Sequence, residues 1–124
     1  MKFTNLQIYS LINSFNEAFA GFDKYIPVKA NFILQKNAGV LAAAAQEVEK
    51  SRLEVAQHYG TLNEEAGRYD IPADKIVEAQ TELDNLFAIE QDLPIKTLSI
   101  ETFGNVEFTP AQMQSIMFMI DEEA

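Results

Sequence analysis

The longest stretch of this chain without a structural break runs from Pro27 to Tyr59, and it constrains the fold more than any other segment. Large apolar side chains recur in it every seventh residue, and smaller or polar ones take the position three residues later. This is the spacing of a helix seam that packs against another helix. The large residues are Leu34, Leu41, Val48 and Val55, and the others are Ala30, Asn37, Ala44 and Ser51. We therefore predict one long helix over residues 27–59, which ends at Gly60.

The length of this helix raises the question of what covers its seam. A straight helix of 32 residues is about 48 Å long, whereas a compact chain of 124 residues is only about 35 Å across. Either the helix bends near Gly39, a position that costs roughly 1 kcal/mol relative to Ala, or one end projects with its seam uncovered. An uncovered apolar seam usually binds another helix. We therefore expect self-association or partner binding through Ala30, Leu34, Asn37, Leu41 and Ala44; the alternative is a bent helix inside an elongated monomer.

Capping signals predict three further helices. Thr4 and Thr109 are each followed three residues later by Gln, which is the pattern of a capping box at a helix N-terminus. The first box predicts a helix over about 4–20, and the second predicts one over about 110–121. A third helix is expected over about 73–91, between two prolines.

The remaining segments predict a small amount of β-structure. Residues 61–71 contain turn-forming residues and indicate a loop or a short hairpin. Alternating apolar residues predict a strand over about 93–101, and Gly104 separates it from a second strand over about 106–108. The expected fold is a single α+β domain over residues 1–124, mainly helical. In it, the long central helix packs with two or three shorter helices and a small antiparallel β-hairpin or sheet.

Composition favours an ordinary globular protein. Hydrophobic residues make up 48% of the chain and charged residues 23%, which argues against a disordered or fibrous class. The lack of cysteine excludes disulfides, thiolate metal sites and thiol nucleophiles. The longest apolar runs are far shorter than the ~20 residues that span a bilayer, and the N-terminus shows no apolar signal core. We expect a cytoplasmic protein without membrane contact.

The net charge of −10 is concentrated in the second half of the chain. Residues 1–58 carry six basic and five acidic side chains, a balance of +1, whereas residues 59–124 carry three basic and fourteen acidic, a balance of −11. The sequence contains no run of Lys and Arg, which a nucleic-acid-binding surface needs. The acidic excess is typical of a solubility device, and the alternative is a surface for a basic partner protein. We expect no nucleic-acid partner.

The candidates for chemistry have simpler structural explanations. His58 is the only histidine, and Glu54 lies four residues before it, a spacing that could hold a metal or orient the imidazole. One histidine with carboxylates is a poor ligand set for a transition metal, and His58 also suits the C-terminus of a helix. The glycines are isolated, so no phosphate-binding loop is present. We predict no catalytic residue, no cofactor, no metal site and no small-molecule substrate, and hence no enzyme.

Methionines near the C-terminus offer a second candidate surface. Met113, Met117 and Met119 lie close together with Phe118, and methionine adapts its shape to varied partners. Such a stripe is usually part of a core, but Phe118 and Met119 fall beside the main apolar stripe. We therefore add these two residues to the candidate interface.

The order of motifs resembles a family of small uncharacterised proteins of tailed bacteriophages and prophages, which are encoded among structural and lysis genes. The resemblance extends over nearly the whole chain. It rests on Tyr25-Ile26-Pro27-Val28-Lys29, Gln35-Lys36-Asn37, Tyr59-Gly60-Thr61-Leu62, Tyr69-Asp70-Ile71-Pro72, Glu82-Leu83 with Leu86, and Thr109-Pro110-Ala111-Gln112-Met113. It implies phage or prophage origin and synthesis in the host cytoplasm. Because these motifs carry no chemistry, the resemblance assigns no functional residue and leaves association with the virion open.

Two functions follow as hypotheses. The first is a non-enzymatic phage or prophage accessory or assembly protein that binds another protein or itself, with a homo-oligomer slightly favoured. The alternative is an acidic regulator or inhibitor that binds a basic host or phage protein by mimicking a polyanion.

Overall fold

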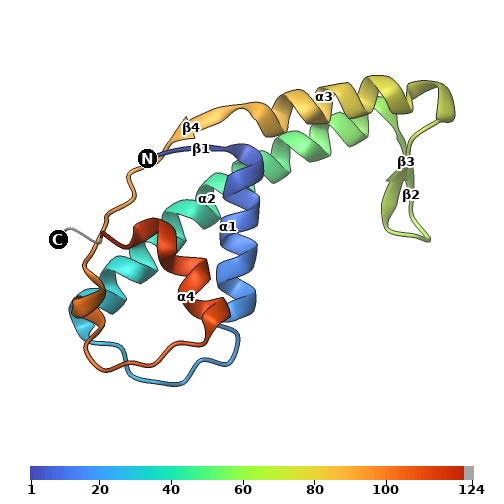
Figure 1. Ribbon diagram of the computed structural model, residues 1–124. Coiled ribbons are helices and arrows are strands. Elements are labelled where there is room, and N and C mark those ends of the chain that lie inside the picture. Colours follow the sequence, from blue (N-terminus) through green and yellow to red (C-terminus); the bar gives the residue numbers. More distant parts are fainter. Residues whose placement is uncertain (122–124) are drawn as a thin grey trace.

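The computed structural model describes residues 1–121 of the chain. Its elements, in order, are β1 (Lys2–Thr4), α1 (Asn5–Ala18), α2 (Val28–Tyr59), β2 (Thr61–Asn63), β3 (Arg68–Asp70), the short 3-10 helix η1 (Ala73–Lys75), α3 (Ile76–Ala88), β4 (Glu90–Asp92), η2 (Ile100–Phe103), α4 (Pro110–Ile116) and η3 (Met117–Met119). The predicted α+β fold, mainly helical with a long central helix and small antiparallel sheets, is confirmed. Figure 1 shows α2 as the axis of the molecule, with α1 and α4 beside its first half and α3 along its second half.

The long helix is continuous from Val28 to Tyr59, so it does not break at Gly39. A Cβ atom added at Gly39 would meet no other atom within 4 Å, because this residue lies on the outside of the helix. Pro27 takes the position before the first helical residue, one place earlier than expected, and its carbonyl accepts a hydrogen bond from the N–H of Asn31 at 2.9 Å. The second half of α2 projects beyond the body of the molecule (Figure 1).

The projecting half of α2 forms an arm together with β2, β3 and α3 (Figure 1). The hairpin of β2 and β3 follows directly on α2, and α3 then returns along it. Gly60 marks the turn: a Cβ atom there would approach the carbonyl oxygens of Ala56 and Asp70 to 2.8 and 3.0 Å, so glycine allows the hairpin to pack against the helix end. We call residues 49–88 the arm and the remainder the body.

The seam of α2 lies inside the body. One core cluster joins Ala30 and Leu34 to residues from the C-terminal segment, and a second joins Leu41 and Ala44 to α1. The buried members of the first cluster are Ile26, Ala30, Leu34, Leu98, Phe103, Ile116 and Met119; those of the second are Ile8, Ile12, Leu41, Ala44 and Leu93. The chain's own elements therefore cover the seam.

This burial corrects the interface inferred from the sequence. Ala30, Leu34, Asn37, Leu41 and Ala44 are each exposed to 7% or less, and so is Met119. Phe118 is half-buried, with its ring edge-on to Phe3 at a centroid distance of 6.0 Å. These residues are not available to a partner, because α1, η2 and η3 occupy the positions that a second chain would take. The heptad pattern identified a packing face correctly but not which helices pack on it.

Two small antiparallel sheets are present among residues 1–121. β1 pairs with β4, with Phe3 opposite Gln91, and β2 pairs with β3, with Leu62 opposite Tyr69. The second pair is the short hairpin expected between residues 61 and 71. The first pair joins the N-terminus of the chain to a segment that was expected to be the end of a helix.

The predicted strands over 93–101 and 106–108 are wrong. Between β4 and Asp121 the described chain forms one parallel bridge, which joins Leu98, just before η2, to Ile120. Asn37 takes the place of a partner strand. Its amide nitrogen donates to the carbonyl of Lys96 at 2.8 Å, and its Oδ1 accepts from the N–H of Lys96 at 3.0 Å. The extended segment is therefore held by a side chain of α2 rather than by a hairpin.

Both predicted capping boxes are present. The Thr4 hydroxyl accepts a hydrogen bond from the N–H of Gln7 at 3.1 Å, and the Thr109 hydroxyl accepts one from Gln112 at 3.2 Å. The helices end earlier than expected, at Ala18, Ala88 and Ile116. The end of α3 is earlier because residues 90–92 pair with β1, and α4 tightens into the 3-10 turn η3.

Candidate functional site

The surface around His58 is a shallow groove at the junction of α2 and α3. His58 is exposed in the last turn of α2, and Glu54 and Glu82 lie along the same groove of about 390 Å³. Val55, Leu86 and Ile89 contribute apolar lining. Among residues 1–121, no three His, Cys, Asp or Glu side chains are grouped so that they could hold a metal ion. The position of His58 at the helix C-terminus agrees with the simpler of the two interpretations.

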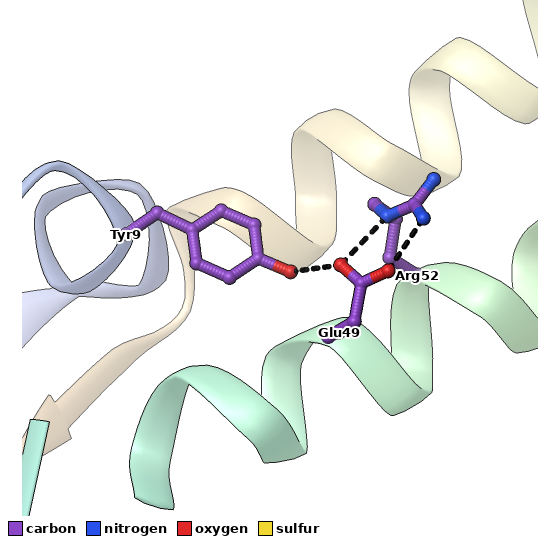
Figure 2. Close-up of polar contacts among 3 residues, drawn as sticks. All are labelled: Tyr9, Glu49 and Arg52. Atoms are coloured by element: carbon purple, nitrogen blue, oxygen red, sulfur yellow. Dashed lines mark hydrogen bonds and ion pairs between the residues drawn. The ribbon is translucent and has the colours of Figure 1, made fainter. Parts of the chain in front are cut away.

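A polar network joins α1 to α2 (Figure 2). Tyr9 donates from its hydroxyl to Glu49 Oε2 at 2.6 Å. Arg52 donates to the same oxygen from Nε at 2.9 Å, and it also donates from Nη2 to the other carboxylate oxygen. Only the spacing of Glu49 and Arg52 along one helix is visible in the sequence; Tyr9 is 40 residues away.

The electrostatics of this network suit a structural tie better than proton transfer. Hydrogen bonds from Arg52, and then from Tyr9, lower the pKa of Glu49 to about 2. Burial, and then the hydrogen bond to Glu49, raises the pKa of Tyr9 to about 12. A general acid or base works best with a pKa near the ambient pH, and both values are shifted away from neutrality. The network therefore fixes the position of α1 on α2 and leaves neither group ready to exchange a proton.

The most exposed apolar residues of α2 lie on its first half, opposite the buried seam. Val28 and Phe32 are 75% and 66% exposed. They lie one turn apart, where two side chains can shield each other, and both are still largely exposed. Lys36 lies one turn further on, with its ammonium 5.9 Å from the centre of the Phe32 ring. We call Val28, Lys29, Phe32 and Lys36 the outer face of α2.

The outer face is basic within an acidic chain. Residues 24–46 contain three lysines and no carboxylate. Lys24 is held by a hydrogen bond from its ammonium to the carbonyl of Glu107 at 3.1 Å. Within the described part of the chain, neither Lys29 nor Lys36 forms an ion pair. The outer face thus combines an exposed aromatic ring with two lysines that have no carboxylate partner among residues 1–121.

Sequence reasoning missed this surface, although its signal was present. Val28 and Phe32 are large apolar residues at helical spacing that do not belong to the heptad seam. In a helix whose seam is already filled by its own chain, such residues point outward. Attention to the seam alone directed the interface prediction to residues that the chain's own elements bury.

The far end of the arm has the opposite character. Within the arm, residues 54–88 carry eight carboxylates and two basic side chains, a balance of −6. Ile76 and Val77 begin α3 there and are 52% and 76% exposed. Asp84 lies seven residues after Val77, on the same side of α3. Asp74 lies in η1 just before α3, and Lys75 separates it from Ile76. We call Asp74, Ile76, Val77 and Asp84 the acidic end.

Comparisons of the chain with protein-family models, curated proteins and solved structures gave no match. The resemblance to phage and prophage proteins thus stays a prediction. In the described part of the chain, no helix is long and apolar enough to cross a membrane.

Proposed function

We propose that this chain is a non-enzymatic accessory or assembly protein, of phage or prophage origin, that acts through protein–protein contacts made by the outer face of α2. The observation that carries the proposal is the exposure of Val28 and Phe32, together with Tyr25 just before the helix. The resemblance of the sequence to small phage proteins supplies the biological setting.

The chemistry of the outer face supports this function. Interfaces are enriched in aromatic residues at their centres, and a few such anchors supply most of the binding energy. Phe32 is an exposed aromatic anchor on a continuous helix, which needs little ordering when it binds. The lysines beside it would favour a partner that presents carboxylates around an apolar centre.

A pair of charge-matched variants tests this function. Phe32→Glu places a negative charge on the outer face, and Gln57→Glu places the same charge on an exposed position of the same helix within the arm. Proteins captured by the wild-type chain from infected or induced cells should be lost with Phe32→Glu and retained with Gln57→Glu. Capture of the same proteins by both variants would remove the outer face from the proposal.

The second candidate function is an acidic regulator or inhibitor that binds a basic protein by mimicking a polyanion. The charge balance of −6 over residues 54–88 favours it. Ionic strength separates the two functions, because salt screens contacts between exposed charges and affects apolar packing much less. Capture that falls steeply between low and high salt, and that survives Phe32→Glu, supports the polyanion mimic.

A further inference from the structure

We propose that the outer face of α2 binds the acidic end of a second copy of this chain, so that copies associate head to tail. This inference rests on the proposed function, in which the outer face is a protein-binding surface, and it names the partner.

The two surfaces have matching chemistry. Each has two exposed apolar side chains in its centre: Val28 and Phe32 on the outer face, and Ile76 and Val77 at the acidic end. The outer face places lysines beside its apolar pair. The acidic end is negative overall, because Asp74, Glu78 and Asp84 outnumber its one lysine, Lys75. Apolar contact in the centre with opposite charges around it is the arrangement that specific interfaces use.

The charges of the outer face have no counterpart nearby on their own helix. The closest carboxylates along the chain are Asp23 and Glu47, which lie outside the stretch of residues 24–46. At the acidic end, Asp84 accepts a hydrogen bond from the neutral amide of Gln80 at 2.8 Å. Among residues 1–121, neither the lysines of the outer face nor the aspartates of the acidic end form an ion pair, so these charges are available to a second copy.

The fold keeps the two surfaces apart. The outer face is in the first turns of α2, while α3 begins beyond the last turns of the same helix (Figure 1). Residues 37–59 of α2 lie between them and extend over about 35 Å, so the surfaces of one copy do not reach each other. Between copies, the outer face of one binds the acidic end of the next. An open assembly of this kind therefore has a free outer face at one end and a free acidic end at the other.

The small size of both patches sets the expected strength. Contacts that bury less than about 1,200 Å² in total are typical of weak and transient complexes. We expect association that grows with protein concentration above about 10 µM and that weakens as salt screens the lysines and aspartates.

Two variants that each disable one surface test the inference. The first carries Phe32→Glu and Lys36→Glu, and the second carries Ile76→Glu and Val77→Glu. All four side chains are exposed, and the two disabled surfaces are both acidic, so they cannot bind each other. Sedimentation equilibrium of the full chain measures the mass, and circular dichroism checks that each variant is folded.

Head-to-tail association gives a specific pattern of masses. The wild-type mass should rise above 13.9 kDa with concentration, while each variant alone stays at 13.9 kDa. An equimolar mixture of the two variants should reach twice 13.9 kDa and stop there, because each variant retains the surface that the other lacks.

Three results would overturn the inference. One is a wild-type mass that stays at 13.9 kDa up to a protein concentration of about 1 mM. This result would exclude self-association even if a variant failed to fold. Another is a mass that rises with concentration in either variant alone as it does in the wild type, because a variant that lacks one surface would then still associate through a symmetric contact. The third is a mixture of folded variants that stays monomeric. In each case the capture experiment with Phe32→Glu remains a separate test, because a different protein could still bind the outer face.

Discussion

Asn37 joins the C-terminal segment of the chain to α2, and its replacement by alanine should destabilise the whole body. The side chain is fully buried and bonds both the N–H and the C=O of Lys96. Its amide nitrogen also lies 3.5 Å from the sulfur of Met119. Asn37→Ala removes these contacts together and leaves two backbone groups of a part-buried segment without partners.

The size of the effect follows from these contacts. A hydrogen bond within a protein contributes a net of about 1 kcal/mol, and a backbone group left unpaired away from water costs more than that. Two such bonds and the lost packing on Met119 give an expected cost of about 2–4 kcal/mol in the free energy of unfolding. With a denaturant slope of about 1–3 kcal/mol per molar urea, the unfolding midpoint should fall by about 1–2 M.

Urea unfolding measures the global loss, and amide hydrogen exchange measures the local one. Gln35→Ala is the matched control, because Gln35 is on the same helix and exposed; its cost should stay within about 0.5 kcal/mol. In Asn37→Ala the Lys96 N–H should exchange faster relative to its neighbours. Equal urea midpoints for the two variants, or unchanged protection of the Lys96 amide, would show that Asn37 does not hold the segment.

The remaining predictions concern the core, a helix cap and the network. Leu41→Ala should cost about 2–5 kcal/mol in urea unfolding, because Leu41 is buried in the second core cluster; the same truncation at the exposed Leu53 should cost far less. Thr109→Ala should cost roughly 1 kcal/mol, because the cap on Gln112 is lost, and a neutral result would mean that the cap is not needed. Glu49→Gln should reduce stability at neutral pH, and its difference from wild type should shrink as pH falls from about 5 to about 2.

The direction of the last effect follows from the pKa of Glu49. Its folded-state pKa of about 2 is below the ordinary carboxyl value, so the carboxylate stabilises the folded state above the ordinary pKa. This contribution is lost as pH falls through the folded-state value. Because the pair is largely exposed, solvent screens it and the effect should be modest. A difference between the variant and wild type that is constant over this range would contradict the assignment.

Local signals predicted most of the helices. Thr4 and Thr109 identified two helix starts, because a capping box is specified by residues three apart in the sequence. The heptad pattern identified the buried side of α2, since that pattern follows from helix geometry alone. Gly39 did not break the helix, because packing of the seam on both sides of it outweighs the cost of one glycine.

Long-range pairing could not be predicted in the same way. β1 and β4 have the sequences Lys2–Thr4 and Glu90–Asp92, which are polar, short and far apart in the chain. The strand expected after residue 93 failed because its alternation reflects burial in the core, and the backbone N–H and C=O of Lys96 bond to the side chain of Asn37 rather than to a neighbouring strand. The candidate interface failed for a related reason: the seam shows which side of α2 is covered, and only the fold shows what covers it.

The arm restricts how related chains could vary in length. Its two helices run beside each other away from the body, and both core clusters lie outside α3 (Figure 1). If one heptad were inserted into α2 alone, the apolar residues of α2 that follow the insertion would no longer lie opposite their contacts on α3. Matched insertions in both helices would preserve these contacts. Natural length variants of this protein should therefore gain or lose turns of the two helices together, with the hairpin carried outward or inward and the body unchanged.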